Sequence, residues 1–441
     1  MGLAPTRAHV TITRRIYFCF AGLLLDVLAL QSSPLGKIIP SSGTLPLGSF
    51  LAPTQRPALR PALFVDNPAT LDQFCQDWLP RIDGAVVALD IEEERGQCYH
   101  PRVALIQLSV DGHDAILDPI VLGHRTLEPT VEQILLTSEL IILHGGRNDV
   151  AGLRRDFDVG PRELGDTQIA ARFIGERHFG LSALLDDHFG IRLDKEERRS
   201  DWSKRPLTES QLRYAQGDTT YLEELWHTLQ KKAIERGWAD AVEEECKALG
   251  EVPADQVTFD PLGWLKIKGM STRDEDIRSR ASRIWWWRDQ IGQSTNTHPS
   301  QILPNWAVEQ ASIRGIDWIR TQSSLVQRLN LIDPTAIDQL QAVLKADLDL
   351  PIQRAREKRE LTLPISPDAM RSRHDALSNW RQEASEKTGV EPGWLAPRSV
   401  LEEVARVQPD ELEILAEEGD VRQWRLNRFA DDWKRILARF R

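Results

Sequence analysis

The sequence has few cysteines, no long apolar run and no excess of positive charge. Its four cysteines lie far apart and include no Cys-x-x-Cys pair. This argues against a zinc site and leaves a disulfide framework unexpected in a chain of 441 residues. No apolar run approaches the roughly 20 residues that a membrane-spanning helix needs. We therefore expect a cytoplasmic protein that does not cross a membrane.

Charge and composition limit which classes of protein and partner the sequence fits. A formal net charge of −11 gives the chain no general attraction for a polyanion, so a nucleic-acid partner has to be argued from local features. With 41 % hydrophobic and 27 % charged residues, the composition is that of an ordinary globular protein. The length predicts several domains rather than one.

Residues 1–61 lack the pattern of a folded domain. Two arginines precede an apolar run at residues 16–25 that has the shape of a short signal-peptide core, but Asp26 interrupts it and no small-x-small cleavage site follows. Residues 31–61 are rich in Pro, Ser and Gly. We expect an N-terminal extension and flexible linker, with a targeting segment or an over-extended start site as the alternatives.

Residues 62–235 combine strand and helix patterns. Brief apolar, β-branched runs predict strands at residues 85–89, 104–110, 113–118 and 140–144. Helical patterns occur at residues 70–79, 149–156, 167–174, 182–189 and from 209 to about 231. Strands that dominate first and helices that dominate later indicate one α/β domain.

The chain after about residue 261 is helical in pattern and contains a repeat. The recurring positions, each offset by 93 residues, are Trp287-Arg288, Pro299 and Pro304, and then Trp380-Arg381, Pro392 and Pro397. An offset shared by two prolines and a Trp-Arg pair predicts two related helical modules. We place them at residues 272–346 and 366–441.

Acidic side chains stand at the end of one predicted strand. Asp90 and Glu92 follow the apolar run at residues 85–89. Because alternate residues of a strand face the same side, both carboxylates should project together. Neighbouring carboxylates repel one another unless a cation or proton separates them, and their hard oxygens favour Mg²⁺ or Mn²⁺. Taken alone, such a pair is more often a solvated turn.

Further acidic positions fit the same site. Asp149 follows a His-Gly-Gly turn after another predicted strand and opens a helix, near the sheet edge that carries Asp90. Tyr214 and Asp218 share one face of a predicted helix, so the phenol could orient a water beside the carboxylate. By itself Asp149 could simply complement a helix N-terminus, and Asp218 could face solvent. Together the acids match what two-metal phosphoryl chemistry requires.

These motifs resemble the DEDD exonucleases of the tyrosine subtype. Residues 193–218 and 103–108 are more closely similar to ribonuclease D, and residues 264–269 with the two helical modules resemble its C-terminal region. The resemblance implies an α/β ribonuclease-H-like exonuclease domain, with a mixed five-stranded sheet, at residues 62–235. Two all-α helical bundle domains of the helicase-and-RNase-D C-terminal type would follow.

The resemblance also implies the chemistry. Asp90, Glu92 and Asp218 would hold one divalent metal ion. Asp90, with Asp149 directly or through water, would hold a second, and Tyr214 would orient the attacking water. The implied reaction is 3′-to-5′ trimming of RNA with Mg²⁺ or Mn²⁺, which releases nucleoside 5′-monophosphates. RNA with a free 3′ end, above all tRNA precursors, is the expected partner.

The sequence departs from the family pattern next to the first acids. Ile91 stands where the family usually has Thr, and we expect it to point away from its neighbours, so that activity survives. Glu93 and Glu94 follow where a less charged stretch is usual. They could add repulsion near the metal ions or face water.

Basic residues are the candidate RNA contacts. They lie before the last acidic motif and near the C-terminal end: Lys195, Arg198, Arg199, Lys204, Arg205, Arg422 and Arg425. Basic runs are commonly just solvated, but proximity to Asp218 favours phosphate binding for the first group. Asp166 is expected to cap a helix and not to bind metal.

Two other functions stay open. The chain could be a DNA 3′-to-5′ exonuclease, since related helical modules also occur on DNA helicases. It could also be an RNA-binding protein with a vestigial nuclease site. The presence of all four acids and the tyrosine argues against the second, because loss of a ligand would be its expected mark. The sequence indicates no oligomeric state.

Overall fold

The structure, a computed structural model, describes residues 60–350 and 366–440 except 95, 194, 195, 347 and 349. Apart from residues 60 and 61, the predicted N-terminal extension lies outside this part of the chain. Among the described residues, no helix combines the length and apolarity that crossing a membrane would require.

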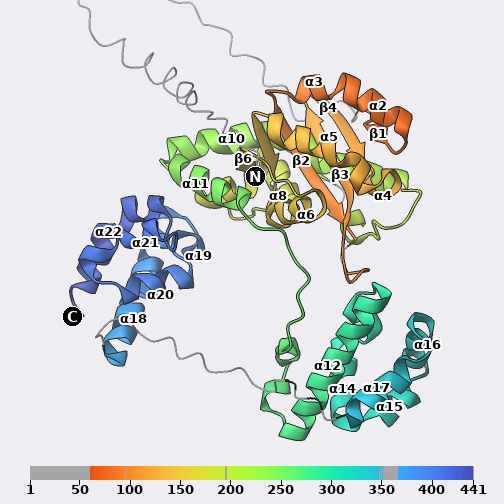
Figure 1. The fold of residues 1–441 in the computed structure, drawn as a ribbon. Helices are drawn as coiled ribbons and strands as arrows, with labels where there is room; N and C mark the ends of the chain where they lie inside the picture. Colours follow the sequence, from red (N-terminus) through yellow and green to blue (C-terminus); the bar gives the residue numbers. More distant parts are fainter. Residues whose placement is uncertain are drawn as a thin grey trace, which may run out of the picture. The chain divides into compact units, whose positions relative to one another are not determined.

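A mixed sheet of six strands forms the centre of the α/β domain (Figure 1). The strands are β1 (Leu63–Val65), β2 (Val86–Glu93), β3 (Val103–Val110), β4 (His113–Leu117), β5 (Leu140–Leu143) and β6 (Leu164–Asp166). Their order is β1-β4-β3-β2-β5-β6, antiparallel on both sides of β3 and parallel elsewhere. The predicted fold class is confirmed, but the expected count of five strands is wrong. The unpredicted β1 and β6 are three residues long, too short for a period-two pattern.

Helices cover both faces of the sheet. One face carries α2 (Pro68–Asp77), α3 (Leu79–Ile82), α5 (His124–Thr137) and α6 (Arg147–Phe157), with α4 (Pro119–Leu122) leading into α5. The other carries α7 (Thr167–Phe173), α8 (Leu181–Phe189), α9 (Glu209–Thr220) and α10 (Leu222–Glu235), with α11 (Ala239–Gly250) beside β6. In β2, Leu89 and Ile91 enter the core of the first face and Ala88 that of the second. The alternation therefore turns Asp90 and Glu92 toward the second face.

The long helix predicted from residue 209 is interrupted. Tyr221, at φ −112° and ψ 3°, separates α9 from α10. Just before it, the Thr220 hydroxyl donates to the Gln216 carbonyl oxygen at 2.7 Å. A hydroxyl that bonds backward in this way competes with the helical ladder and favours a bend. The break ends α9 directly after the turn that carries Asp218.

The described chain after α11 is helical. The first module contains η2 (Gly263–Lys266), η3 (Met270–Thr272), α12 (Glu275–Thr295), α13 (Pro299–Ile302), α14 (Asn305–Arg314), α15 (Ile316–Thr321), α16 (Ser323–Ile332) and α17 (Ala336–Lys345). The second contains α18 (Pro367–Thr388), α19 (Pro392–Leu395), α20 (Arg398–Arg406), η4 (Pro409–Glu411), α21 (Ile414–Glu417) and α22 (Gln423–Leu437). The domain boundaries set from the sequence stay predictions.

The sequence repeat has a physical basis in the hydrogen bonds of two arginines. Arg288 Nη1 donates to the Leu303 carbonyl oxygen at 2.8 Å, and Arg381 Nη1 donates to the Ala396 carbonyl oxygen at 3.1 Å. Each acceptor is the C-cap residue that directly follows a four-residue helix, α13 in one module and α19 in the other. Pro299 and Pro392 begin these helices, so the repeated residues build the same corner twice.

A second pair of arginines at the same offset fixes the next helix. Arg280 Nε donates to the Ser312 carbonyl oxygen at 2.6 Å, and Arg373 Nη1 donates to that of Ala405 at 3.1 Å. Arg373 is fully buried, and its other bonds reach the carbonyl oxygens of Val407 and Phe440. One side chain therefore ties α18 to the ends of α20 and α22.

Replacing Arg373 by methionine should destabilise the second module strongly, because one buried and two partly buried carbonyl groups lose their donor. We expect the free energy of unfolding to fall by about 2–4 kcal/mol, measured by thermal unfolding with circular dichroism. Arg371→Met is the matched control: that side chain is exposed and pairs with exposed Asp368, so its loss should change little. Equal effects of the two changes would contradict the structural role of Arg373.

Candidate active site

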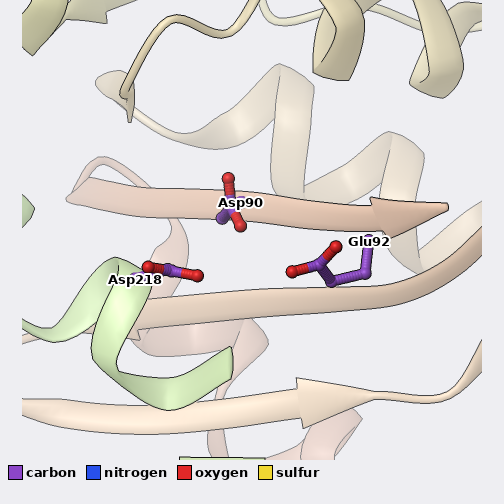
Figure 2. A group of neighbouring side chains, drawn as sticks. All are labelled: Asp90, Glu92 and Asp218. Atoms are coloured by element: carbon purple, nitrogen blue, oxygen red, sulfur yellow. The ribbon is translucent and has the colours of Figure 1, made fainter. Parts of the chain in front are cut away.

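Three carboxylates from β2 and α9 converge on one point (Figure 2). Each of Asp90, Glu92 and Asp218 offers one oxygen, and these oxygens all lie within 4.8 Å of one another. Asp90 and Glu92 are alternate residues of β2, and Asp218 faces them from α9. Within the described residues, this is the group of His, Cys, Asp and Glu side chains that could hold a metal ion.

The convergence carries an electrostatic cost. Burial raises the pKa of Asp90 well above its usual value, and the negative charges of Asp149 and Asp218 raise it further. Burial, with Asp218 and Asp149 again next in size, raises the pKa of Glu92 to about 9. For Asp218, burial raises the pKa to about 7, against a hydrogen bond from Tyr214 and the charge of Arg198. Without a cation, these carboxylates are costly to ionise together. A divalent cation, which prefers hard oxygen donors, would stabilise their ionised form.

Asp149 lies in the first turn of α6 and outside this three-residue group. It is near enough to raise the pKa values of Asp90 and Glu92. The turn before it depends on glycine: Gly145 has φ +68°, and a Cβ on Gly146 would lie 2.3 Å from Leu143. Close packing of this turn against the end of β5 fixes where α6 begins.

Asp166 anchors the same turn from the next strand. One of its carboxylate oxygens accepts from the Gly146 amide at 2.8 Å, and the other accepts from the amides of Gln168 and Ile169 at the start of α7. The predicted helix-capping role of Asp166 is confirmed. Both oxygens are used inside the fold.

Tyr214 lies one turn before Asp218 on α9, as its spacing predicts. Its ring packs against Trp202, with 6.1 Å between ring centroids. Burial and then the charge of Asp218 raise the pKa of Tyr214, so the phenol keeps its proton and acts as a donor. Trp202 is a contact that the sequence did not identify, although an aromatic residue shortly before the predicted helix of Tyr214 and Asp218 is a visible signal.

The extra acids after Glu92 are neutralised by arginines. Glu93 pairs with Arg155 and Glu94 with Arg102, both at 3.0 Å between nitrogen and oxygen. Glu93 still makes a smaller contribution to the raised pKa of Glu92. Ile91 points away into the core beneath α6, as predicted.

The basic segment before α9 divides into two kinds of residue. Arg198, Arg199 and Lys204 are exposed, and the charge of Arg198 reaches Tyr214 and Asp218. Lys195 lies outside the described residues. Arg205 is instead structural, and we withdraw it as an RNA contact.

All the donor nitrogens of Arg205 are used within the domain. They bond to Asp118, which is fully buried, and to the carbonyl oxygens of Ala104, Trp202 and Lys204. This arginine ties the segment before α9 to β3 and to the end of β4. Its effect on the site is to hold α9, and Asp218 with it, over the sheet.

The predicted RNA contact at Arg425 also disagrees with the structure. Arg425 is only 4 % exposed, its Nη1 lies 2.7 Å from Glu245 Oε1 of α11, and its other donors bond to the carbonyl oxygens of Trp394 and Leu395. Its charge is therefore balanced within the protein. Arg422 is half-buried at the start of α22 and stays a predicted contact.

Family comparison gives two matches along the chain. Residues 64–234 match the 3′-5′ exonuclease family, and residues 371–437 match the HRDC domain family. Ribonuclease D of Haemophilus influenzae is 37 % identical over 235 residues, which cover 52 % of this chain and 58 % of that protein. Ribonuclease D of Zymomonas mobilis is 31 % identical over 265 residues, 60 % of this chain and 66 % of that protein. The matches span about two thirds or less of these relatives.

Solved structures share the fold. A protein from Bifidobacterium adolescentis superposes with a TM-score of 0.69 at 20 % identity, covering 86 % of this chain and 97 % of that one. The Escherichia coli RNase D structure gives 0.58 at 21 % identity, covering 86 % of this chain and 100 % of that one. At these identities the likeness concerns the fold alone.

The raised pKa values predict how stability depends on pH when no divalent cation is added. A raised carboxyl pKa gives stability that is present below the unfolded value and is lost as pH rises through the folded value. For Glu92 this window runs from 4.5 to about 9, and for Asp218 from 3.8 to about 7. The unfolding temperature in chelator should therefore fall between pH 5 and 8, which calorimetry would measure.

Glu92→Gln tests this cause. In chelator at pH 8 the variant should be more stable than the original chain, with a gain of about 2–4 °C for each kcal/mol of relieved repulsion. Exposed Glu128 provides the control, since Glu128→Gln should leave the pH profile unchanged. A Glu92→Gln variant that unfolds at lower temperature than the original would oppose this account.

Proposed function

We propose that this chain, a relative of ribonuclease D, is a 3′-to-5′ exoribonuclease that trims the 3′ ends of RNA by metal-dependent hydrolysis. The observation that carries the proposal is the convergence of Asp90, Glu92 and Asp218 within 4.8 Å, beside Tyr214, in a domain that matches the 3′-5′ exonuclease family. Acidic residues gathered on a sheet under a helix suit phosphodiester hydrolysis better than simple RNA binding, which needs positive charge.

The metal ligands follow from the arrangement of donors. Asp90, Glu92 and Asp218 would hold one Mg²⁺ or Mn²⁺, and Asp90 with Asp149 a second, as the resemblance implies. Asp149 affects the pKa values of Asp90 and Glu92, which supports its place at the same centre. When bound, the ions supply the positive charge that stabilises the negative charge developing on the phosphate.

The protein groups position the reactants. Water adds to phosphorus as the bond to the 3′ oxygen of the preceding nucleotide breaks, so the terminal nucleotide leaves as a 5′-monophosphate. Tyr214, protonated and hydrogen-bonded to Asp218, is placed to orient that water. Trp202 packs against its ring and limits how far the phenol can move.

Substrate contact is assigned to two regions. The exposed Arg198, Arg199 and Lys204 would bind backbone phosphates near the 3′ end, and the HRDC module, including Arg422, would contact the body of the RNA. Precursor tRNA is the RNA class that we propose as substrate, and the cytoplasm as its location. A DNA 3′-to-5′ exonuclease is the second candidate, because the matched family is described as a 3′-5′ exonuclease without reference to RNA or DNA.

Substrate class is tested with matched single-stranded RNA, single-stranded DNA and a tRNA precursor that carries a 3′ trailer. Each is incubated with Mn²⁺ or with chelator, and products are separated by length. We expect Mn²⁺-dependent release of mononucleotides from RNA. Degradation of DNA as fast as RNA would support the second candidate, and no release from any substrate would support a vestigial site.

Asp90→Ala should abolish nucleotide release, because it removes the carboxylate assigned to both ions. Tyr214→Phe should slow release by about 10²-fold or more, the usual scale for a positioned proton-transfer or orienting group. Mn²⁺ affinity, measured by calorimetry, should stay nearly unchanged in Tyr214→Phe and fall in Asp90→Ala. Loss of metal binding in Tyr214→Phe would show that the phenol acts on the ligands instead.

Arg198→Ala should raise KM for RNA by about 10-fold or more, since a charge-assisted hydrogen bond contributes roughly 1.5–3 kcal/mol. The rate at saturating RNA should change much less. Arg213→Ala is the matched control on α9, where the exposed side chain pairs with exposed Glu209. If both variants shift KM equally, the effect is general electrostatics and Arg198 has no specific contact.

A further inference from the structure

Gln107 of β3 has a fully buried side chain without a hydrogen bond. Neither its amide nitrogen nor its amide oxygen meets a partner among the described residues. Burying an unpaired amide costs about 1–3 kcal/mol, so a group of this kind calls for an explanation. In the sequence, Gln107 stands out as the amide within an otherwise apolar run at residues 103–108.

The sheet register places Gln107 directly opposite Asp90. Opposed residues of antiparallel strands share a face, with Cβ atoms about 4.5–5.5 Å apart. Gln107 therefore faces the same side of the sheet as the convergent carboxylates. A glutamine side chain is long enough to reach its opposed neighbour across that distance.

The neighbours of Gln107 on this face define what lies above it. Leu105 packs in a cluster with Ala215 of α9, and the Ser109 hydroxyl bonds to Thr219 of α9 at 2.8 Å. Gln107 stands between them in β3. Gln107 is therefore covered by the stretch of α9 that contains Asp218, and it lies in the sheet next to Asp90.

We propose that Gln107 is a positioning residue for metal binding: when the Asp90 carboxylate turns to bind a cation, the unpaired amide N–H of Gln107 would donate to it and fix its orientation. This inference rests on the proposed function of the acidic group. A carboxylate that serves two cations has to present defined oxygens to each, and a donor behind it removes rotational freedom. Groups that bond to metal ligands in this way typically change metal affinity by 10–100-fold.

A purely structural role for Gln107 predicts a different result for metal affinity. If Gln107 only fills space, an apolar residue of similar shape is a better occupant, because it removes the unpaired amide. Such a replacement would then stabilise the fold and leave metal binding unchanged. The positioning role shares the effect on the fold but requires metal affinity to fall, so metal affinity separates the two.

The test compares Gln107→Met with the original full-length chain by calorimetric titration with Mn²⁺ alone, without RNA. We expect an unfolding temperature in chelator that is equal or higher, and a Kd for Mn²⁺ weakened by about 10–100-fold. Ser109→Ala is the control two residues along the same face. It loses buried hydrogen bonds to Asp114 and Thr219, so it should unfold earlier while keeping its affinity for Mn²⁺.

Unchanged Mn²⁺ affinity in Gln107→Met would overturn the inference. Should that variant fail to fold, Gln107→Leu supplies the same comparison with a shorter, branched side chain. An original chain that binds no Mn²⁺ would overturn the proposed function and this inference with it. That outcome is distinguishable from the first, in which the original chain binds the ion normally.

Discussion

Repulsion among three partly buried carboxylates is the interaction around which this domain is built. Asp90, Glu92 and Asp218 come within 4.8 Å of one another, and their pKa values rise because burial and the neighbouring charges both oppose ionisation. Such an arrangement persists only when the surrounding structure imposes it. A central strand, β2, and a helix packed across it, α9, supply that constraint.

Several contacts around the group act to hold it or to limit its cost. Arg205, which sequence reasoning assigned to RNA, instead binds buried Asp118 and fixes the segment that leads into α9. Arg155 and Arg102 neutralise Glu93 and Glu94, so the acids that follow Glu92 add little to the repulsion. The unusual charge of this stretch is thus compatible with a metal site, because each added acid is paired with an arginine, Glu94 with Arg102 and Glu93 with Arg155, which also binds Asp156 and Asp255.

The parts of the structure that could be predicted are those with local causes. Alternation along β2 is enough to place Asp90 and Glu92 on one face and Ile91 on the other, and helical spacing pairs Tyr214 with Asp218. Strands of three residues carry no periodic pattern, so β1 and β6 were missed. Arg425 could not be assigned from the sequence for a different reason. It lies in a basic helix, but its ion-pair partner, Glu245 of α11, is far away in the chain. The unpaired amide of Gln107 likewise became visible only from the packing around it.

We infer that the carboxylates of this group hold protons until a divalent cation replaces those protons. Proton release on addition of Mn²⁺ tests it most directly, measured in weakly buffered solution at pH 7. With the pKa of Glu92 at about 9 and that of Asp218 at about 7, binding should release protons, and Glu92→Gln should reduce the number released. Binding of Mn²⁺ without proton release, or release that Glu92→Gln does not alter, would contradict the account.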